Sequence, residues 1–276
     1  MEAKTLKVPG ATLYYEVRGS GPVLLAIPGG PTEAGIFTAF AEQLADRYTV
    51  VTYDPRGHSR STVDNRDEDV SVAQHADDAA ALIVAVSQGE AAYVLGSSGG
   101  ATIGLELVVR HGDKVKAFVG HEPPVMELLP DADRWRAIFK DLQETYRKEG
   151  VFAAFGKFGA AVEEGGPSYS EQREPSDPTP EMLAMMERMT ANGEFFFEHE
   201  MMPIGSYVPD IDALKASPTR IYIGVGKESG EQGAYRAGVA LASKLGIEPT
   251  YFEGAHGGAG AEEAFGERTH EALQGS

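Results

Sequence analysis

The sequence of 276 residues contains no cysteine. This absence excludes disulfide bonds, thiolate catalysis and cysteine-based zinc or iron–sulfur sites. The sequence also has no uncharged apolar run of about 18 residues, which excludes a transmembrane helix. Its first residues, Met1 to Lys4, lead directly into strand-like sequence without the apolar segment of a signal peptide. We therefore expect a cytoplasmic protein that does not engage a membrane.

Positive charge is scarce as well. The chain carries 24 lysine and arginine residues against 42 aspartate and glutamate residues, which gives a formal net charge of −18. Such a field repels a phosphate backbone, so we expect no nucleic-acid partner. Hydrophobic residues make up 42% of the chain and aromatic residues 9%, enough for a sizeable folded core. The length suits one large α/β domain that carries an insertion, or at most two domains.

Strand-like and helical segments alternate towards both ends of the chain. Short apolar or β-branched runs predict strands at residues 12–17, 23–27, 48–53, 92–95, 115–119, 220–225 and 250–252. Helical segments are predicted at residues 34–45, 75–86, 100–109, 235–245 and 261–273. This alternation predicts a mostly parallel sheet that is covered by helices on both faces.

The middle of the chain breaks that alternation. Helices without strands are predicted at residues 133–149, 151–162 and 180–191, and a stretch rich in proline, glycine and serine at 165–179 interrupts them. We therefore predict an α/β core formed by residues 1–123 and 214–276. A helical cap, residues 124–213, is expected to be inserted over the C-terminal edge of the sheet.

A candidate nucleophile lies between a predicted strand and a predicted helix. Gly96 to Gly100 matches the pattern G-x-S-x-G with Ser98 at its centre. The turn from strand to helix is too sharp for side chains two residues before and two residues after the serine. Strain holds the hydroxyl above the sheet, and the helix N-terminus behind it favours developing negative charge. Ser98 is therefore the expected nucleophile.

With this motif in place, the chain resembles the α/β-hydrolases over nearly its whole length, least of all in the cap. The resemblance implies an eight-stranded, mostly parallel sheet flanked by helices, with an inserted helical cap. Ile27 to Pro31 takes the place of the family's oxyanion loop, with Pro28 where most relatives have histidine. The donors implied by this resemblance are the backbone N–H groups of Gly30 and Gly99.

A second loop matches the family pattern D-x-R-G-x-G-x-S. It runs from Asp54 to Ser61, with Ser59 in the place of the second glycine. Its aspartate, arginine and histidine could pass for catalytic residues. In the family the loop is structural, so Asp54, Arg56 and His58 are left out of the expected chemistry.

His256 is the expected general base. It follows the last predicted strand, in a loop that returns over the nucleophile, and the order serine, acid, histidine fits the family. Among the other histidines, His58 and His121 lie in or beside structural turns, and His199 belongs to the cap, at the surface or lining the pocket. His75, His111 and His270 are expected on or at the ends of helices, facing solvent.

The acid has two candidates. Most relatives place an aspartate in a G-x-x-D turn after the penultimate strand, but here that turn runs from Gly226 to Ser229 and ends in serine. Glu228 is its neighbour, and Glu122 ends the preceding strand, so either carboxylate could reach the imidazole. His121-Glu122-Pro123-Pro124, taken with Ser97-Ser98-Gly99, resembles the zearalenone lactonases, which use a glutamate after this strand. That resemblance implies the triad Ser98, Glu122 and His256, with Glu228 as the alternative acid.

The expected pocket is apolar. Methionines and phenylalanines between Met182 and Met202 pack between cap and sheet, and some of them roof the cavity above Ser98. Trp135 and Phe139 are one helical turn apart on the first cap helix and could form part of the same wall. An apolar roof suits a hydrophobic acyl or aryl group.

These residues predict a serine hydrolase that cleaves a carboxylic ester or lactone of a small hydrophobic molecule through an acyl-enzyme. No metal or cofactor is expected, and the protein is expected to be a monomer or a homodimer. The same triad also suits a carbon–carbon bond hydrolase or a natural-product tailoring enzyme. A non-catalytic receptor on this fold is the third reading.

Overall fold

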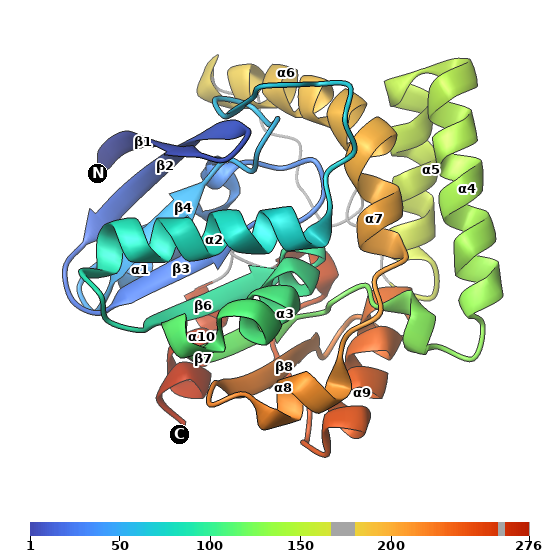
Figure 1. Cartoon of the computed structure of the whole chain (residues 1–276). Coiled ribbons are helices and arrows are strands. Elements are labelled where there is room, and N and C mark those ends of the chain that lie inside the picture. The colour runs from blue at the N-terminus through green and yellow to red at the C-terminus, as the bar shows by residue number, and fades with distance from the viewer. Residues whose placement is uncertain (167–179, 259–262, 276) are drawn as a thin grey trace.

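The computed structural model describes residues 1–166, 180–258 and 263–275. A twisted sheet crosses the centre of the molecule (Figure 1) in the strand order β1-β2-β4-β3-β6-β7-β8-β9. These strands are β1 (Glu2–Val8), β2 (Ala11–Gly19), β3 (Val23–Ile27), β4 (Thr49–Tyr53), β6 (Ala92–Ser97), β7 (Val115–His121), β8 (Arg220–Gly226) and β9 (Thr250–Phe252). A two-residue strand, β5 (Thr62–Val63), pairs with β2. From β4 to β9 the pairing is parallel, as predicted.

The burial of each strand follows its place in the sheet. All five residues of β3 are buried, because helices cover both faces there and the strand is apolar throughout. The edge strand β1 is mostly exposed and pairs only with β2, in antiparallel register. Its lysines, Lys4 and Lys7, are typical of an edge strand that avoids pairing with another chain. The sequence prediction began at residue 12 and missed this strand.

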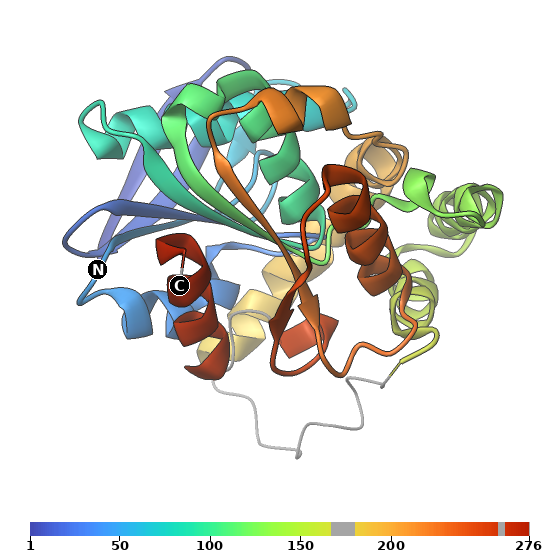
Figure 2. The same cartoon turned by 90° about the horizontal axis from the view of Figure 1, so that it is seen from below.

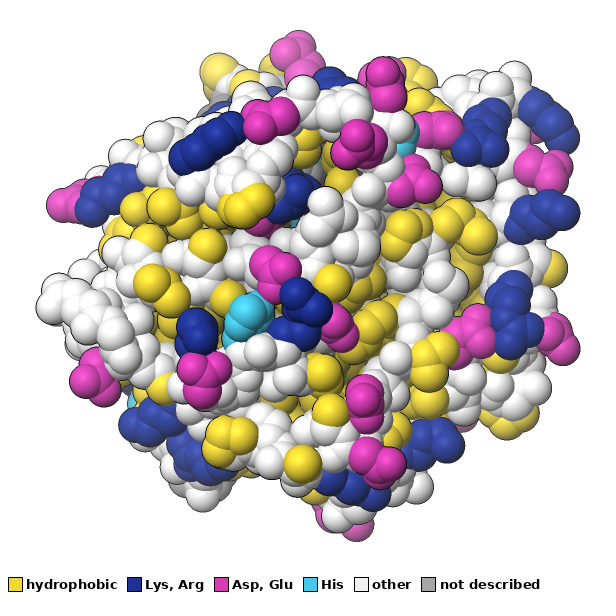
Figure 3. All heavy atoms as spheres, viewed as in Figure 1, with side chains coloured by type: hydrophobic (Ala, Val, Ile, Leu, Met, Phe, Trp, Pro, Cys, Tyr) yellow, Lys and Arg dark blue, Asp and Glu magenta, His cyan; other side chains and the backbone are white. Residues whose placement is uncertain are grey.

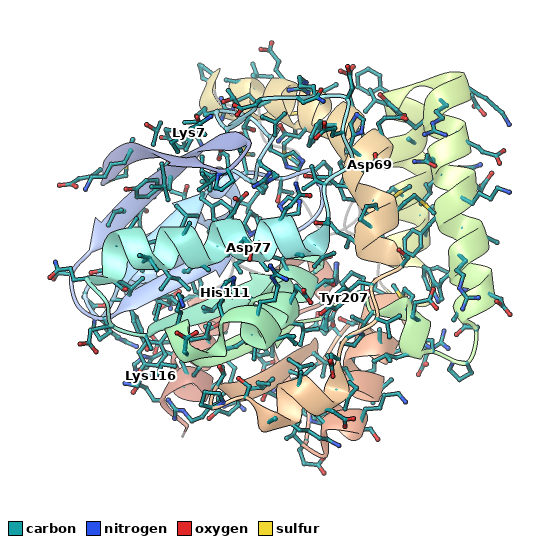
Figure 4. All side chains as sticks on the ribbon, in the orientation of Figure 1. Lys7, Asp69, Asp77, His111, Lys116 and Tyr207 are labelled. Atoms are coloured by element: carbon teal, nitrogen blue, oxygen red, sulfur yellow. The ribbon has the colours of Figure 1, made fainter. Side chains whose placement is uncertain are left out.

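Helices pack in two layers (Figure 2). On one face lie α2 (Val72–Ser87), α3 (Gly99–His111), α8 (Ile211–Ala216) and α9 (Gly233–Leu245), and on the other lie α1 (Thr38–Leu44) and α10 (Glu263–Gln274). Each layer has its own apolar cluster against the sheet. The helices α2 and α3 are neighbours, since His111 Nε2 lies 2.7 Å from a carboxylate oxygen of Asp77 (Figure 4).

Further helices are inserted between β7 and α8, and we call residues 126–205 the helical insertion. It contains η3 (Met126–Leu128), α4 (Ala132–Glu149), α5 (Val151–Glu163), α6 (Pro180–Phe195), the π-helix η4 (Phe196–Glu200) and α7 (Met201–Gly205). The remaining short helices are η1 (Ala34–Phe37), η2 (Gly112–Lys114) and η5 (His256–Gly258). Most of the predicted break at 165–179 lies outside the described residues, and the division of the chain into core and cap stays a prediction.

Several polar contacts attach the insertion, and the segment that follows it, to the core. Arg188 of α6 forms a bidentate pair with Glu33, whose side chain is almost wholly buried, at 2.6 and 2.7 Å. His199 contacts Asp69 at 3.1 Å, and the Tyr207 hydroxyl donates to Glu106 at 2.8 Å. Figure 4 shows Asp69 beside the end of the insertion and Tyr207 on the segment that follows α7.

The surface mixes charges of both signs. Figure 3 shows acidic and basic side chains interspersed over the face seen in Figure 1, with hydrophobic side chains exposed between them. The negative net charge is therefore not gathered into one patch on that face. Among the described helices, none combines the length and the apolar character needed to cross a membrane.

Candidate active site

Ser98 lies at a strained turn between β6 and α3. Its backbone has φ 53° and ψ −125°, a conformation that residues other than glycine rarely adopt. A Cβ atom at Gly96 would lie 2.4 Å from the carbonyl oxygen of Gly100, and one at Gly100 would lie 2.1 Å from that of Ile27. Both distances are far below contact, so the close approach of backbone segments requires glycine at the two positions. The motif found in the sequence is therefore a steric requirement of this turn.

The structure brings the three predicted side chains together. His256 Nε2 lies 3.1 Å from Ser98 Oγ, and His256 Nδ1 lies 2.7 Å from Glu122 Oε2. Of the two candidate acids, Glu122 is the one beside the imidazole, whereas the side chain of Glu228 is exposed. The three residues come from the ends of β6 and β7 and from the loop after β9, which meet at one edge of the parallel sheet.

Glu122 is held from both sides. Its residue is fully buried, and its Oε1 atom accepts hydrogen bonds from the Gly226 backbone N–H at 2.8 Å and from the Ser229 hydroxyl at 2.5 Å. Burial alone would raise the pKa of Glu122, but the bond to His256 and the other donors lower it to about 2. Ser229 occupies the position where the family aspartate was expected. It therefore contacts Glu122, the carboxylate that lies beside the imidazole.

The two predicted backbone donors lie beside Ser98. Gly30 and Gly99 line the same pocket as Ser98 and His256. A Cβ atom built on Gly99 would lie 3.4 Å from the backbone nitrogen of Gly30, so the two N–H groups are close neighbours. The Gly99 N–H also belongs to the first turn of α3, where the helix dipole favours negative charge. Two such donors can stabilise an oxyanion that forms next to Ser98.

The pocket above Ser98 is apolar. It encloses an empty space of about 630 Å³, including its open mouth. Trp135 and Phe139 of α4 form one wall, as predicted, and Phe196 and Met201 contribute from the end of the insertion. Among the described lining residues there is no aspartate, glutamate, lysine or arginine. Within the same described ranges, no group of histidine and carboxylate side chains is arranged to hold a metal ion.

A second, smaller cavity lies behind the oxyanion loop. It is lined by the backbone of Gly29 and Gly30 and by the side chains of His58, His75 and Glu200. His58 Nε2 is 2.8 Å from a Glu200 oxygen and His75 Nε2 is 3.1 Å from the other, although neither contact is aligned as a hydrogen bond. The prediction that His75 faces solvent is wrong: its side chain is buried, because α2 turns it towards this cavity.

In this second cavity Glu200 and His58 favour each other's charged forms. Burial would raise the pKa of Glu200, but the neighbouring His58 and His75 lower it to about 2. Burial likewise opposes protonation of His58, yet the carboxylate of Glu200 raises the pKa of His58 above its ordinary value. Sequence reasoning missed Glu200, although an acidic residue close to three phenylalanines and two methionines was a signal of a paired charge in an apolar region.

The loop from Asp54 to Ser61, predicted to be structural, is bonded to several other segments of the protein. Arg56 forms a buried bidentate pair with Asp78 at 2.6 and 2.7 Å, and Asp54 accepts the backbone N–H of Ala34 at 2.9 Å. Ser59, which replaces a family glycine, has a left-handed φ of 46°. Its backbone N–H donates to Asn192 at 2.6 Å and its hydroxyl donates to the Glu33 carboxylate at 2.6 Å, which offsets the strain.

Comparisons with known proteins agree with this architecture. The family model described as alpha/beta hydrolase fold matches residues 22–216. An uncharacterised hydrolase of Bacillus subtilis, YraK, is 38% identical over 98% of this chain and 95% of its own length. The enol-lactonase from Burkholderia xenovorans superposes with a TM-score of 0.73 at 16% identity, covering 99% of this chain and 100% of its own. A thermophilic esterase from Thermogutta terrifontis gives 0.72 at 19% identity, covering 100% and 97%. The chain belongs to the α/β-hydrolase fold family.

Proposed function

We propose that this protein is a serine hydrolase that cleaves a carboxylic ester or lactone of an uncharged, hydrophobic small molecule. The observation that carries the proposal is the continuous contact from Ser98 through His256 to Glu122, at 3.1 and 2.7 Å, at the floor of an uncharged pocket. This arrangement provides a nucleophile, a base and a group that orients the base. The B. subtilis relative, named a hydrolase, supports the same class.

In the proposed reaction His256 Nε2 accepts the proton of Ser98 as the hydroxyl attacks the carbonyl carbon. The N–H on Nδ1 donates to Glu122, which fixes the tautomer and stabilises the imidazolium that forms. The backbone N–H groups of Gly30 and Gly99 donate to the oxyanion. His256 then protonates the leaving alkoxide, and a water molecule activated by the same imidazole cleaves the acyl-enzyme.

The pocket suggests the substrate class. Because no charged side chain among the described residues lines it, a charged acyl or alcohol group would lose its hydration there without a partner. Aromatic and methionine side chains instead favour an aryl or alkyl group. We also propose that residues 124–213 act as a cap, since α4, α5 and the end of the insertion line the pocket. The esterases and lactonases among the structural neighbours are compatible with this substrate class.

The test compares the wild type with Ser98→Ala on an aryl acetate and on zearalenone. Wild-type cleavage of the aryl acetate that falls by about 10⁶ in Ser98→Ala would support the proposal. Serine-dependent opening of zearalenone would extend it to macrolactones. Turnover that survives in Ser98→Ala, or a wild type that neither hydrolyses an ester nor reacts with a fluorophosphonate probe, would contradict it. A β-diketone, cleaved in place of the esters, would assign carbon–carbon chemistry to the same serine.

A further inference from the structure

The oxyanion loop, Ile27 to Pro31, lies between two cavities. Gly30 and Gly99 line both the pocket above Ser98 and the smaller cavity that contains Glu200. Side chains in the smaller cavity can therefore act on the backbone donors from behind, without contact with substrate. His58 is the side chain that connects this cavity to the loop.

The peptide group between Gly29 and Gly30 has a partner on each side. Its N–H is the proposed oxyanion donor, and its carbonyl accepts a hydrogen bond from the hydroxyl of Thr32 at 2.7 Å. A trans peptide is planar and its C=O and N–H point in opposite directions, so a bond that fixes the carbonyl also fixes the N–H. A carbonyl that accepts a hydrogen bond also makes the N–H of the same peptide a stronger donor.

Thr32 is held in turn by His58, a side chain that lines the second cavity. His58 Nδ1 lies 3.2 Å from the Thr32 carbonyl oxygen, which can only accept, so this ring nitrogen carries a proton. On the other side of the ring, Nε2 lies 2.8 Å from the carboxylate of Glu200. Glu200 ends the π-helix of the insertion and is 2% exposed. The contacts thus run from the insertion through His58 and Thr32 to the peptide that ends at Gly30.

We propose that Thr32 is a positioning residue for the hydrolytic reaction. Its hydroxyl directs the N–H of Gly30 at the forming oxyanion, and the pair of His58 and Glu200 holds Thr32 in place. The inference rests on the proposed function, since it concerns the oxyanion of that reaction. It assigns a catalytic effect to residues that do not touch the substrate, and it makes the insertion a support of the oxyanion hole as well as a wall of the pocket.

The first test is Thr32→Val, which keeps the shape of the side chain and removes the hydroxyl. We expect kcat for an aryl acetate to fall about 10- to 30-fold with KM unchanged, less than the loss of about 10²–10³-fold that complete removal of a donor causes. Thr32→Ser, which restores the hydroxyl, should recover most of kcat. The pH profile should keep its wild-type shape, because Thr32 does not contact His256.

A second readout separates positioning from a general structural role. An aryl trifluoromethyl ketone adds to the serine hydroxyl and forms a tetrahedral adduct that carries an oxyanion. Thr32→Val should therefore weaken the affinity for this ketone by the same factor by which it lowers kcat. Binding of the corresponding methyl ketone should not change if it does not add to the serine. The matched control is Thr269→Val, which removes another hydroxyl that donates to a backbone carbonyl, at 2.8 Å, in the remote helix α10. It should leave kcat unchanged.

Glu200→Gln tests the rest of the path. It removes the charge next to His58, and a folded variant should show a loss in kcat and in trifluoromethyl ketone affinity of about the same factor as Thr32→Val. A folded Thr32→Val with wild-type kcat, or one whose defect lies only in KM, would overturn the positioning role. If wild-type turnover still depends on Ser98, that result would leave the proposed function standing. Wild-type kcat in folded Glu200→Gln would remove the insertion from the path.

Discussion

Two buried pairs of histidine and glutamate lie on opposite sides of the oxyanion loop. His256 is 2.7 Å from Glu122 on the pocket side, and His58 is 2.8 Å from Glu200 behind the loop. In both pairs burial opposes the charged carboxylate, but neighbouring histidines, His256 at Glu122 and both His58 and His75 at Glu200, lower its pKa to about 2. The residue types and the separations are thus nearly the same.

The difference lies at the second ring nitrogen. His256 Nε2 faces the Ser98 hydroxyl, which can both donate and accept a proton, whereas His58 Nδ1 faces the carbonyl of Thr32, which only accepts. A histidine next to a hydroxyl can exchange a proton with it. His58, between a carbonyl and a carboxylate, has no hydroxyl with which to exchange a proton, so we expect it to stabilise the structure and not to act as a base. The partner of the far nitrogen, more than the glutamate, separates the two roles.

The largest expected effect breaks the first pair. His256→Gln should lower kcat for an aryl acetate by about 10⁶-fold, because the serine then has no base. Its far-UV circular dichroism should match that of the wild type. Residual activity within a factor of a hundred of wild type would contradict the assignment of the base, with steady-state kinetics on purified protein as the measurement.

Removing the charge of the acid should cost less. Glu122→Gln should lower kcat by about 10⁴-fold, since the amide no longer stabilises the imidazolium and can favour the wrong tautomer. Glu228→Gln is the matched control, two residues after Gly226, whose N–H donates to Glu122. It should leave kcat unchanged. If Glu228→Gln proved to be the severe variant, the acid would have to be reassigned.

Breaking the second pair, His58 and Glu200, should lower the free energy of unfolding. His58→Gln leaves Glu200 as a buried carboxylate with His75, 3.1 Å away, as its remaining partner, and breaking a buried pair costs about 3–5 kcal/mol of unfolding free energy. His111→Gln, which breaks the partly exposed contact with Asp77 (Figure 4), should cost about 1 kcal/mol or less. Urea denaturation measures both. Equal losses of unfolding free energy in the two variants would show that the buried pair stabilises the protein no more than the partly exposed one.

The two pairs should also differ in their dependence on pH. The pKa of Glu122 is lowered to about 2, so its contribution is fully present above the unfolded-state value of about 4.3 and is lost as pH falls towards 2. The pKa of His58 is raised, so its contribution is fully present below about 6.5 and is lost as pH rises through the folded-state value. The free energy of unfolding of Glu122→Gln should therefore approach that of the wild type in acid, and that of His58→Gln should approach it in alkali. A constant difference from about pH 2 to pH 10 would contradict both.

The smallest expected effect concerns Ser229. Ser229→Ala removes one of the two donors that hold Glu122 Oε1 and leaves the Gly226 N–H in place, so kcat should fall by about tenfold. Ser206→Ala, which removes an exposed hydroxyl bonded to a helix carbonyl, is the control and should have no effect. An unchanged kcat in Ser229→Ala would show that the backbone donor is sufficient.

The sequence predicted the parts of the fold that depend on local pattern. Buried apolar strands such as β3 and the turn around Ser98 can be read from adjacent residues, because their constraints are local. The edge strand β1 was missed, since its polar, exposed sequence lacks the apolar signal of a buried strand. Glu122 was preferred over Glu228 through a resemblance, because no local pattern reports which of two neighbouring strand ends carries the acid.

Groups that meet only through the fold could not be predicted. Glu200, His58 and His75 come from three separate elements, and their pairing depends on how the insertion packs on the core. A partial signal existed for His75: it shares a helical face with Val72 and Ala79, both buried, which placed it inward by periodicity. The bond of Thr32 to the Gly29 carbonyl is local, but its proposed effect on an oxyanion can be inferred only once the fold has placed Gly30 beside Ser98.

The π-helix η4 sets the direction in which the following side chains point, so inserting or deleting a single residue there should reorient them. A π turn holds one residue more than an α-helical turn, and each added residue rotates the rest of the helix by about 100°. Without that extra residue, Met201 would turn away from the pocket it lines and Glu200 would lose its place beside His58. We therefore expect insertions and deletions to be far less tolerated between Phe196 and Glu200 than in the exposed loop from Asn65 to Glu68, and a deletion scan of both segments would measure that contrast.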